Sequence, residues 1–421
     1  MDRRVLFASL VLFAGGATGV GVALFAFVGV DDATIDAEVV WESEPVAGDD
    51  GSGAVVATMD GDPLVLQPTV DDGHRTIRAT AAGGDVEWAT TVEGLDSPVD
   101  VPDPPADSTD PPPTSGLVTG SLAGGEVAAF TTESGALVVL DPADGTELFA
   151  VDLGGPGGLR PAIGDLDGDG DTEVAAATTT GRIRAVDAAG DTVFEADLDA
   201  TVERRPLAVD FGASDEAGVG GDGDDPARGL AVVTGADDER SITLLDATGA
   251  VRWTTTPSVT PLSWSAADTR DGPVLALGGA NGNLEAIDVA DGGTRYEVGL
   301  QDLPVVVGDA DPGRVHVAGS GSVWAVDPLA GEVVWKQQYG GETRVNAPGV
   351  ADVDGDGSPG PVVVNRNGGV LALNQNGEAI ARGNVGRAVV YAGPLFADVT
   401  GDGSAEVLVV TEDGRIVALS D

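Results

Sequence analysis

The 421-residue sequence predicts an all-β fold built from repeats of one four-stranded unit. Three observations indicate this: short alternating apolar segments between Gly- and Asp-rich turns, a fixed glycine-to-aromatic spacing, and a recurrent proline. Residues 161–194 hold a complete unit. It starts with an apolar segment led by Pro161, continues through an acidic loop and strands over 174–177 and 183–185, and ends at Phe194. Such alternation between turns is typical of short antiparallel strands.

The spacing of four residues between a glycine and an aromatic residue recurs along the chain. The pairs are Gly84 with Trp88, Gly145 with Phe149, Gly190 with Phe194, Gly249 with Trp253, Gly292 with Tyr296, and Gly331 with Trp335. Two further units keep only one residue of the pair. Trp41 keeps the aromatic but has Ala37 in place of the glycine, and Gly377 keeps the glycine but has Ala381 in place of the aromatic. Because these aromatics share one position in the repeat, we expect them to pack between neighbouring units.

Four-stranded repeats of this kind predict a β-propeller, in which each blade packs both faces on its neighbours. The last unit stops after its third strand at Asp421, whereas the first strand-like stretch, 37–44, lacks the three strands that should precede it. We therefore expect the strand around Val39–Trp41 to pair with Ile416–Leu419 and complete eight blades. A ring of seven is the alternative if residues 45–95 are not a full blade.

Two sets of motifs carry a resemblance to known repeat families. The loops GDLDGDGDTEV, ADVDGDGSPGPVVV and ADVTGDGSAEVLVV resemble the FG-GAP (VCBS-type) repeats of integrin-α-like propellers. The strand endings VWAVDPLAGEVVW and LVVLDPADGTELF resemble the PQQ-like repeats of quinoprotein-type propellers. Together these resemblances cover residues 37–421. They imply a fold rather than one function, since enzymes, adhesion receptors and scaffolds share such repeats.

The first acidic loop predicts a Ca²⁺ site. Four carboxylates stand at positions 1, 3, 5 and 9 of a nine-residue loop, with a backbone carbonyl near position 7; the residues are Asp165, Asp167, Asp169, Glu173 and, at position 7, Asp171. Hard oxygen ligands at alternate positions suit Ca²⁺. Since the loop joins two strands of one blade, we expect the ion to stabilise structure. An acidic turn that binds no ion is the alternative.

Two later loops predict weaker Ca²⁺ sites. One keeps Asp352, Asp354 and Asp356 but has Gly360 at position 9. The other keeps Asp398, Asp402 and Glu406 but has Thr400 at position 3. Fewer carboxylates should weaken the binding of a hard cation.

The charge of the chain limits its partners and setting. The formal net charge is −49, the acids are spread evenly, and Lys336 is the only lysine. This composition resembles proteins of extreme halophiles (haloarchaeal type), whose acidic surface is screened by salt. An acidic surface for a cationic partner is the alternative. The sequence has no basic patch that could neutralise phosphates, which disfavours nucleic acid as a partner.

Residues 5–30 are uncharged, largely apolar and long enough to span a bilayer. Arg3 and Arg4 precede the segment and Asp31 and Asp32 follow it, so the positive-inside rule places the N-terminus in the cytoplasm. We thus expect a signal-anchor helix over 1–30 and a propeller domain over 31–421 outside the cell. The alternative is a cleaved signal, of the twin-arginine type, and a secreted protein.

These observations favour a non-enzymatic propeller that is anchored in the cell membrane, stabilised by calcium, and active in binding, assembly or adhesion at the cell surface. Its partner would be an unknown protein or polysaccharide, and no catalytic residues stand out. The alternative is a propeller enzyme, resembling a PQQ-dependent dehydrogenase or a polysaccharide lyase. Two inserts, 102–113 and 212–229, are interpreted as solvated loops.

Overall fold

The structure, a computed structural model, describes residues 35–46, 53–59, 61–71, 74–91, 116–132, 134–210, 228–236, 239–311, 313–339, 346–390 and 393–420. They belong to the compact unit Thr34–Asp421. The expected anchor over 1–30, the insert 102–113 and nearly all of the insert 212–229 lie outside the described residues. Within the described residues, no helix has the length and hydropathy needed to cross a membrane.

Eight antiparallel four-stranded meanders form the blades. Blade 1 consists of β3 (Val55–Met59), β4 (Asp62–Asp71), β5 (His74–Ala81) and β6 (Val86–Thr91). Blade 2 consists of β7 (Val118–Leu122), β8 (Gly125–Thr131), β9 (Ala136–Leu140) and β10 (Glu147–Asp152). Blade 3 consists of β11 (Ala162–Gly164), β12 (Glu173–Ala177), β13 (Arg182–Val186) and β14 (Thr192–Asp197). Blade 4 consists of β15 (Leu207–Asp210), β16 (Arg228–Ala236), β17 (Glu239–Asp246) and β18 (Val251–Thr255). Blade 5 consists of β19 (Pro261–Ala267), β20 (Val274–Gly279), β21 (Asn283–Asp288) and β22 (Thr294–Gly299). Blade 6 consists of β23 (Val306–Asp311), β24 (Arg314–Ala318), β25 (Ser322–Val326) and β26 (Val333–Gln338). Blade 7 consists of β27 (Gly349–Ala351), β28 (Gly360–Val364), β29 (Gly369–Leu373) and β30 (Ala379–Asn384). Blade 8 consists of β31 (Leu395–Ala397), β32 (Glu406–Val410), β33 (Ile416–Ser420) and, as its fourth strand, β2 (Glu38–Glu42).

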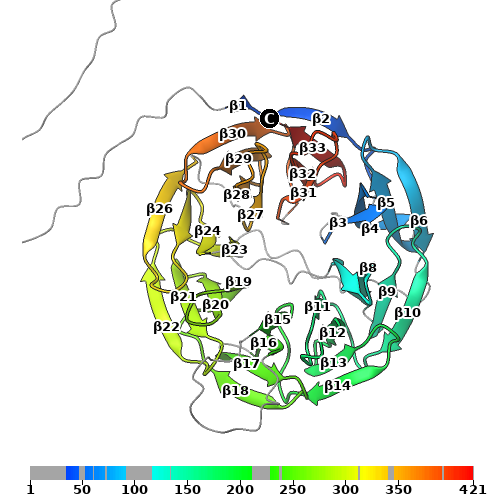
Figure 1. The fold of residues 1–421 in the computed structure, drawn as a ribbon, viewed down its shortest axis with the longest axis vertical. Coiled ribbons are helices and arrows are strands. Elements are labelled where there is room, and N and C mark those ends of the chain that lie inside the picture. Colours follow the sequence, from blue (N-terminus) through cyan, green and yellow to red (C-terminus); the bar gives the residue numbers. More distant parts are fainter. Residues whose placement is uncertain are drawn as a thin grey trace, which may run out of the picture. The chain divides into compact units, whose positions relative to one another are not determined.

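The blades are arranged as a ring, with the first strand of each blade innermost and the fourth at the rim (Figure 1). The innermost strands contact one another in chain order from β3 to β27, and β31 contacts β3. Eight blades are therefore confirmed. The seven-bladed alternative is wrong, because β3 to β6 form a full blade within residues 45–95.

The N-terminal strand closes the ring as predicted. β2 pairs antiparallel with β33, with Val39 opposite Leu419 and Trp41 opposite Ala418. Just beyond β2, the Ser43 N–H donates to the Ile416 carbonyl at 2.9 Å. One strand was not predicted: β1 (Ile35–Asp36) pairs parallel with β30 and adds a fifth strand to blade 7.

The core lies between the blades. The middle strands carry small and branched apolar residues on both faces, and β12 and β32 are buried along their whole length. Each apolar cluster joins neighbours; Ile77 of blade 1 packs with Phe130 of blade 2, and Leu230 of blade 4 with Phe194 of blade 3. Trp264 and Trp324, which break the aromatic repeat, are also buried in the core.

The structure explains the glycine-to-aromatic spacing. At six of the eight junctions, from blades 1 and 2 to blades 6 and 7, the aromatic ring of one blade lies against the turn glycine of the next. A Cβ on Gly292 would lie 2.8 Å from the Trp253 ring, and a Cβ on Gly377 would lie 2.5 Å from the Trp335 ring. The Trp253 Nε1 also donates to the Val289 carbonyl at 2.9 Å. The turn needs glycine, since φ is +74° at Gly292. The predicted packing role of the aromatics is confirmed.

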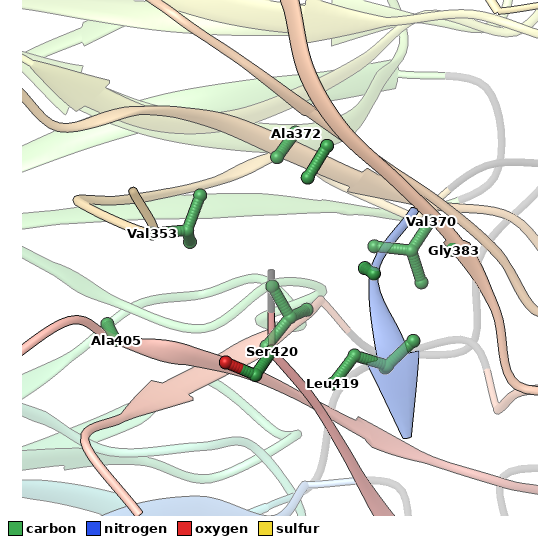
Figure 2. Close-up of a pocket in the computed structure, with 10 residues that line it drawn as sticks. Val353, Val370, Ala372, Gly383, Ala405, Leu419 and Ser420 are labelled. Carbon is green, nitrogen blue, oxygen red and sulfur yellow. The ribbon is translucent and has the colours of Figure 1, made fainter. Parts of the chain in front are cut away.

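This contact is missing where blade 7 meets blade 8, because Ala381 stands in place of the aromatic. A small cavity of about 20 Å³, which is room for about one water, lies there. Figure 2 shows its apolar lining, including Val353, Val370 and Leu419, with Gly383 beside them. Strand β1 joins the same blade at Ala381.

Candidate metal centres

The first acidic loop connects β11 to β12 and brings three of its predicted ligands together. Carboxylate oxygens of Asp165, Asp167 and Glu173 lie within 4.8 Å of one another. Asp169 and Asp171 are outside this group; the Asp169 carboxylate accepts a hydrogen bond from the Asp171 N–H at 2.8 Å. Backbone N–H groups fold the loop around Asp165, whose two oxygens accept from Gly168 and Gly170 at 2.7 and 3.1 Å. Positive φ at both glycines allows the backbone to curl this way.

The second loop, between β27 and β28, forms a similar group. Oxygens of Asp352, Asp354 and Asp356 lie within 4.8 Å of one another. The Asp352 Oδ2 accepts from the Gly357 N–H at 2.9 Å, whereas its Oδ1 is buried and has no hydrogen-bond partner in the part of the chain that the structure describes. A buried carboxylate oxygen without a donor is costly, and a bound cation would satisfy it.

The third loop, between β31 and β32, does not gather its carboxylates into such a group among the described residues. Backbone N–H groups donate hydrogen bonds to these carboxylates instead. The Asp398 oxygens accept from the N–H groups of Gly401 and Gly403 at 2.6 and 2.9 Å. Buried Glu406 accepts from the Val399 N–H at 2.7 Å and from the Thr400 hydroxyl at 3.2 Å. Of the three loops, this one offers a cation the fewest free oxygens.

Burial and, after it, the mutual repulsion of the carboxylates raise the pKa values of several loop residues. Burial, followed by the neighbouring charges of Asp169 and Asp165, raises the pKa of Asp167. Burial also raises the pKa of Glu173, and Asp167 adds to that shift. In the second loop, burial and then Asp356 raise the pKa of Asp354. A divalent cation would relieve this repulsion, so the first two loops fit Ca²⁺ in charge and ligand type.

One residue near the first loop was not anticipated. Arg228, on β16 of blade 4, forms an ion pair with the Asp165 Oδ2, and its Nε lies 3.4 Å from the Asp210 Oδ2. This guanidinium bridges blades 3 and 4 and partly neutralises the carboxylate at position 1 of the loop. It therefore competes with a cation for one ligand.

A second unpredicted group consists of Arg160, Arg205 and Asp309, from blades 3, 4 and 6. Burial lowers the pKa of Arg160 to about 10, and the Arg205 charge lowers it too, while Asp309 opposes the shift. Desolvation by the surrounding protein raises the pKa of Asp309, although the residue is exposed and both arginines favour its ionised form. The Arg160 Nε has no hydrogen-bond partner among the described residues. Each arginine directly precedes a proline that opens a repeat, which is the signal that the sequence offered for this group.

The fold and repeats define a β-propeller of the PQQ-like repeat class. A family model described as outer membrane protein assembly factor BamB matches residues 137–302 and 238–421, which together make up more than half of the chain. The chain belongs to this family. The PQQ-like part of the resemblance is thereby confirmed, whereas the FG-GAP part remains a prediction. No curated protein matches the chain.

Solved structures with the same fold come from varied proteins. BamB from Moraxella catarrhalis is 18% identical, with a TM-score of 0.57 over 91% of this chain and 98% of that one. Quinohemoprotein alcohol dehydrogenase from Comamonas testosteroni is 16% identical, with a TM-score of 0.58 over 91% of this chain and 76% of that one. BBS1N, solved in complex with ARL6DN, is 17% identical, with a TM-score of 0.51 over 72% of this chain and 90% of that one. At such identities the likeness is one of fold.

Proposed function

We propose that this propeller is a non-enzymatic binding and assembly module. The observation that carries the proposal is membership of a family whose model is described as an assembly factor. Support comes from BBS1N, a propeller of similar fold that was solved in complex with another protein. The likeness to the quinohemoprotein dehydrogenase, at 16% identity, is one of fold, and a propeller enzyme is the alternative. The partner is a protein or a polysaccharide at the cell surface.

A pull-down from surface material tests this function. The tagged full chain is incubated in high salt, which keeps so acidic a surface screened, and bound material is divided between protease and glycosidase treatment. A partner lost with protease is a protein, and one lost with glycosidase is a polysaccharide. The Arg270→Ala variant, which changes an exposed arginine, is the matched control and should retain the partner. Recovery of no specific partner in either arm would contradict the proposal.

We further propose that residues 1–30 anchor the propeller in the cell membrane and that the ring lies outside the cell. The support is the 26-residue uncharged run at 5–30 and the charges that flank it. The mature protein is expected to keep Met1 and to sediment with membranes. N-terminal sequencing of released protein that begins near Asp31 would show cleavage and refute the anchor.

Calcium is the third part of the proposal: the ion stabilises the ring, most strongly at the loop Asp165–Glu173. A ligand that binds only the folded state adds about 2.7 kcal/mol at a hundredfold excess over Kd. Chelation should therefore lower the melting temperature. Asp167→Ala should remove more of the calcium-dependent increment than Asp354→Ala or Asp402→Ala. The sequence places four carboxylates in the first loop, and the three that the structure gathers there include the buried Glu173.

The measurement is thermal unfolding with and without chelator, at one constant salt concentration because screening itself changes the stability of an acidic chain. Loss of the calcium effect in Asp354→Ala but not in Asp167→Ala would reverse the ranking. If neither chelator nor any variant shifted the melting temperature, the three loops would be acidic turns without a metal.

A further inference from the structure

The rim of the ring is made of eight outer strands, and each has one edge that is not paired within its own blade. Unpaired strand edges invite association with other chains, and charged side chains on an edge discourage it. Five of the eight outer strands carry acidic residues, namely β2, β6, β10, β14 and β22. The three without acids are β18, β26 and β30.

The edge of β30 is already in use. β1 adds to it in parallel, with Ile35 in register with Ala381 and Asp36 in register with Arg382. The Ala37 N–H continues this pairing and donates to the Arg382 carbonyl at 2.7 Å. Blade 7 thus shows that an outer edge of this ring accepts an extended segment in parallel, here with the sequence Ile-Asp.

Strand β26 also has a basic residue at this position in the repeat. Counting from the turn glycine, Trp335 corresponds to Ala381 and Lys336 to Arg382. At this position the other six outer strands carry Glu42, Ala89, Ala150, Glu195, Thr254 and Glu297. Only β26 and β30 present a basic residue there, in a chain with net charge −49.

The edge of β26 is open in the described part of the chain, where its one partner strand is β25. Val333 and Val334 are 43% and 49% exposed. The Lys336 Nζ lies 5.0 Å from the centre of the Trp324 ring, so its ammonium is held over the blade by a cation–π contact. Apolar side chains and a fixed cation along an open edge suit main-chain pairing with a strand of opposite charge.

The neighbouring blade extends this low-acid region. Residues 361–397 contain three arginines and a single acid, Glu378. Blades 6 and 7 also touch, since the Trp335 Nε1 donates to the Gln375 carbonyl at 2.9 Å. Depletion of charge is typical of the centre of a protein interface. An acidic segment approaching β26 therefore meets no acidic residue on β26 or β30.

We propose that the free edge of β26 binds an extended segment of a partner protein, added in parallel, in which an apolar residue precedes a carboxylate that faces Lys336. The inference rests on the proposed binding function and specifies its site and the chemistry of the partner. Backbone hydrogen bonds supply affinity, while the cation at Lys336 selects the acid.

The test uses a fluorescent peptide with the sequence of residues 32–38, DATIDAE, and the full chain. The peptide should bind, and Lys336→Glu should weaken binding about tenfold, since it replaces an attractive pair by a repulsive one. A peptide with lysine at the position of Asp36 should recover binding to Lys336→Glu. Arg252→Glu, on the acid-free strand β18, is the matched control and should leave binding unchanged.

Backbone pairing is tested with a peptide that is N-methylated at alternate residues, which removes its N–H donors but keeps its charge. This peptide should not bind; binding at full strength would overturn strand addition. Sensitivity to Arg382→Glu instead of Lys336→Glu would mean that the peptide merely replaces β1, which also overturns the proposal.

Two further outcomes are diagnostic. If the chain dimerises in sedimentation and Lys336→Glu abolishes the dimer, the occupant is a second copy rather than a partner protein, and the proposal is wrong. If the partner from the surface pull-down stays bound to Lys336→Glu, the binding function stands and the assignment to β26 fails. Unchanged melting of Lys336→Glu confirms that the variant is folded.

Discussion

Deletion of residues 31–46 is expected to open the ring and to destabilise it severely. The deleted segment contains β2, which pairs with β33 and is the fourth strand of blade 8. It also removes Ser43, whose hydroxyl accepts from the Ile416 N–H at 3.0 Å, and Glu42, which forms an ion pair with Arg387 at 3.2 Å. Without this segment, β33 becomes an exposed edge beside blade 1.

The expected loss is about 5 kcal/mol, taking about 1 kcal/mol for each of roughly five main-chain hydrogen bonds of β2. That amount rivals the whole stability of many domains. Circular dichroism should show a large fall in melting temperature at constant salt. The control is deletion of 31–36, which removes β1 but leaves β2 in place and should be milder. A 31–46 deletion that melts like the full chain would show that another segment closes the ring.

The fold could be predicted because most blades share one sequence pattern. The glycine and the aromatic of each repeat take part in the same kind of contact, in which the turn glycine of one blade lies against the aromatic ring of the blade before it. Gly292 and Trp253 are an example. Ring closure followed from counting strands at the two ends of the chain. β1 could not be predicted, because a strand of two residues is too short to show alternation.

The candidate metal loops could be predicted in part. Local spacing brought Asp165, Asp167 and Glu173 together, because these residues belong to one short loop. The ion pair of Arg228 with Asp165 depends on the packing of two blades and joins residues 63 positions apart. The surroundings of half-buried Arg160 likewise depend on the assembled ring, which brings Asp309 of blade 6 near it. The Arg-Pro pairs at Arg160 and Arg205 mark two of these residues in the sequence, but no local pattern encodes which residues they contact.

Removal of one inter-blade contact should show how much the repeated glycine–aromatic pair contributes. Trp253→Ala is expected to cost about 3 kcal/mol, through lost packing and loss of the hydrogen bond to Val289. Gly292→Ala should cost about 1–2 kcal/mol for a non-glycine residue at positive φ and about 1–3 kcal/mol more for the clash with the ring. Chemical denaturation measures both changes.

Gly124→Ala is the matched control for the glycine substitution. Its φ of +78° is close to the +74° of Gly292, but a Cβ there would meet no atom within 4 Å. It should therefore cost only the backbone part, about 1–2 kcal/mol. In the double variant Trp253→Ala with Gly292→Ala, the ring that clashes with the new methyl group is gone. The double variant should then lose about 1–3 kcal/mol less than the sum of the single variants. Strict additivity of the two changes, or equal costs for Gly124→Ala and Gly292→Ala, would show that Gly292 is required by its turn and not by the ring of the preceding blade.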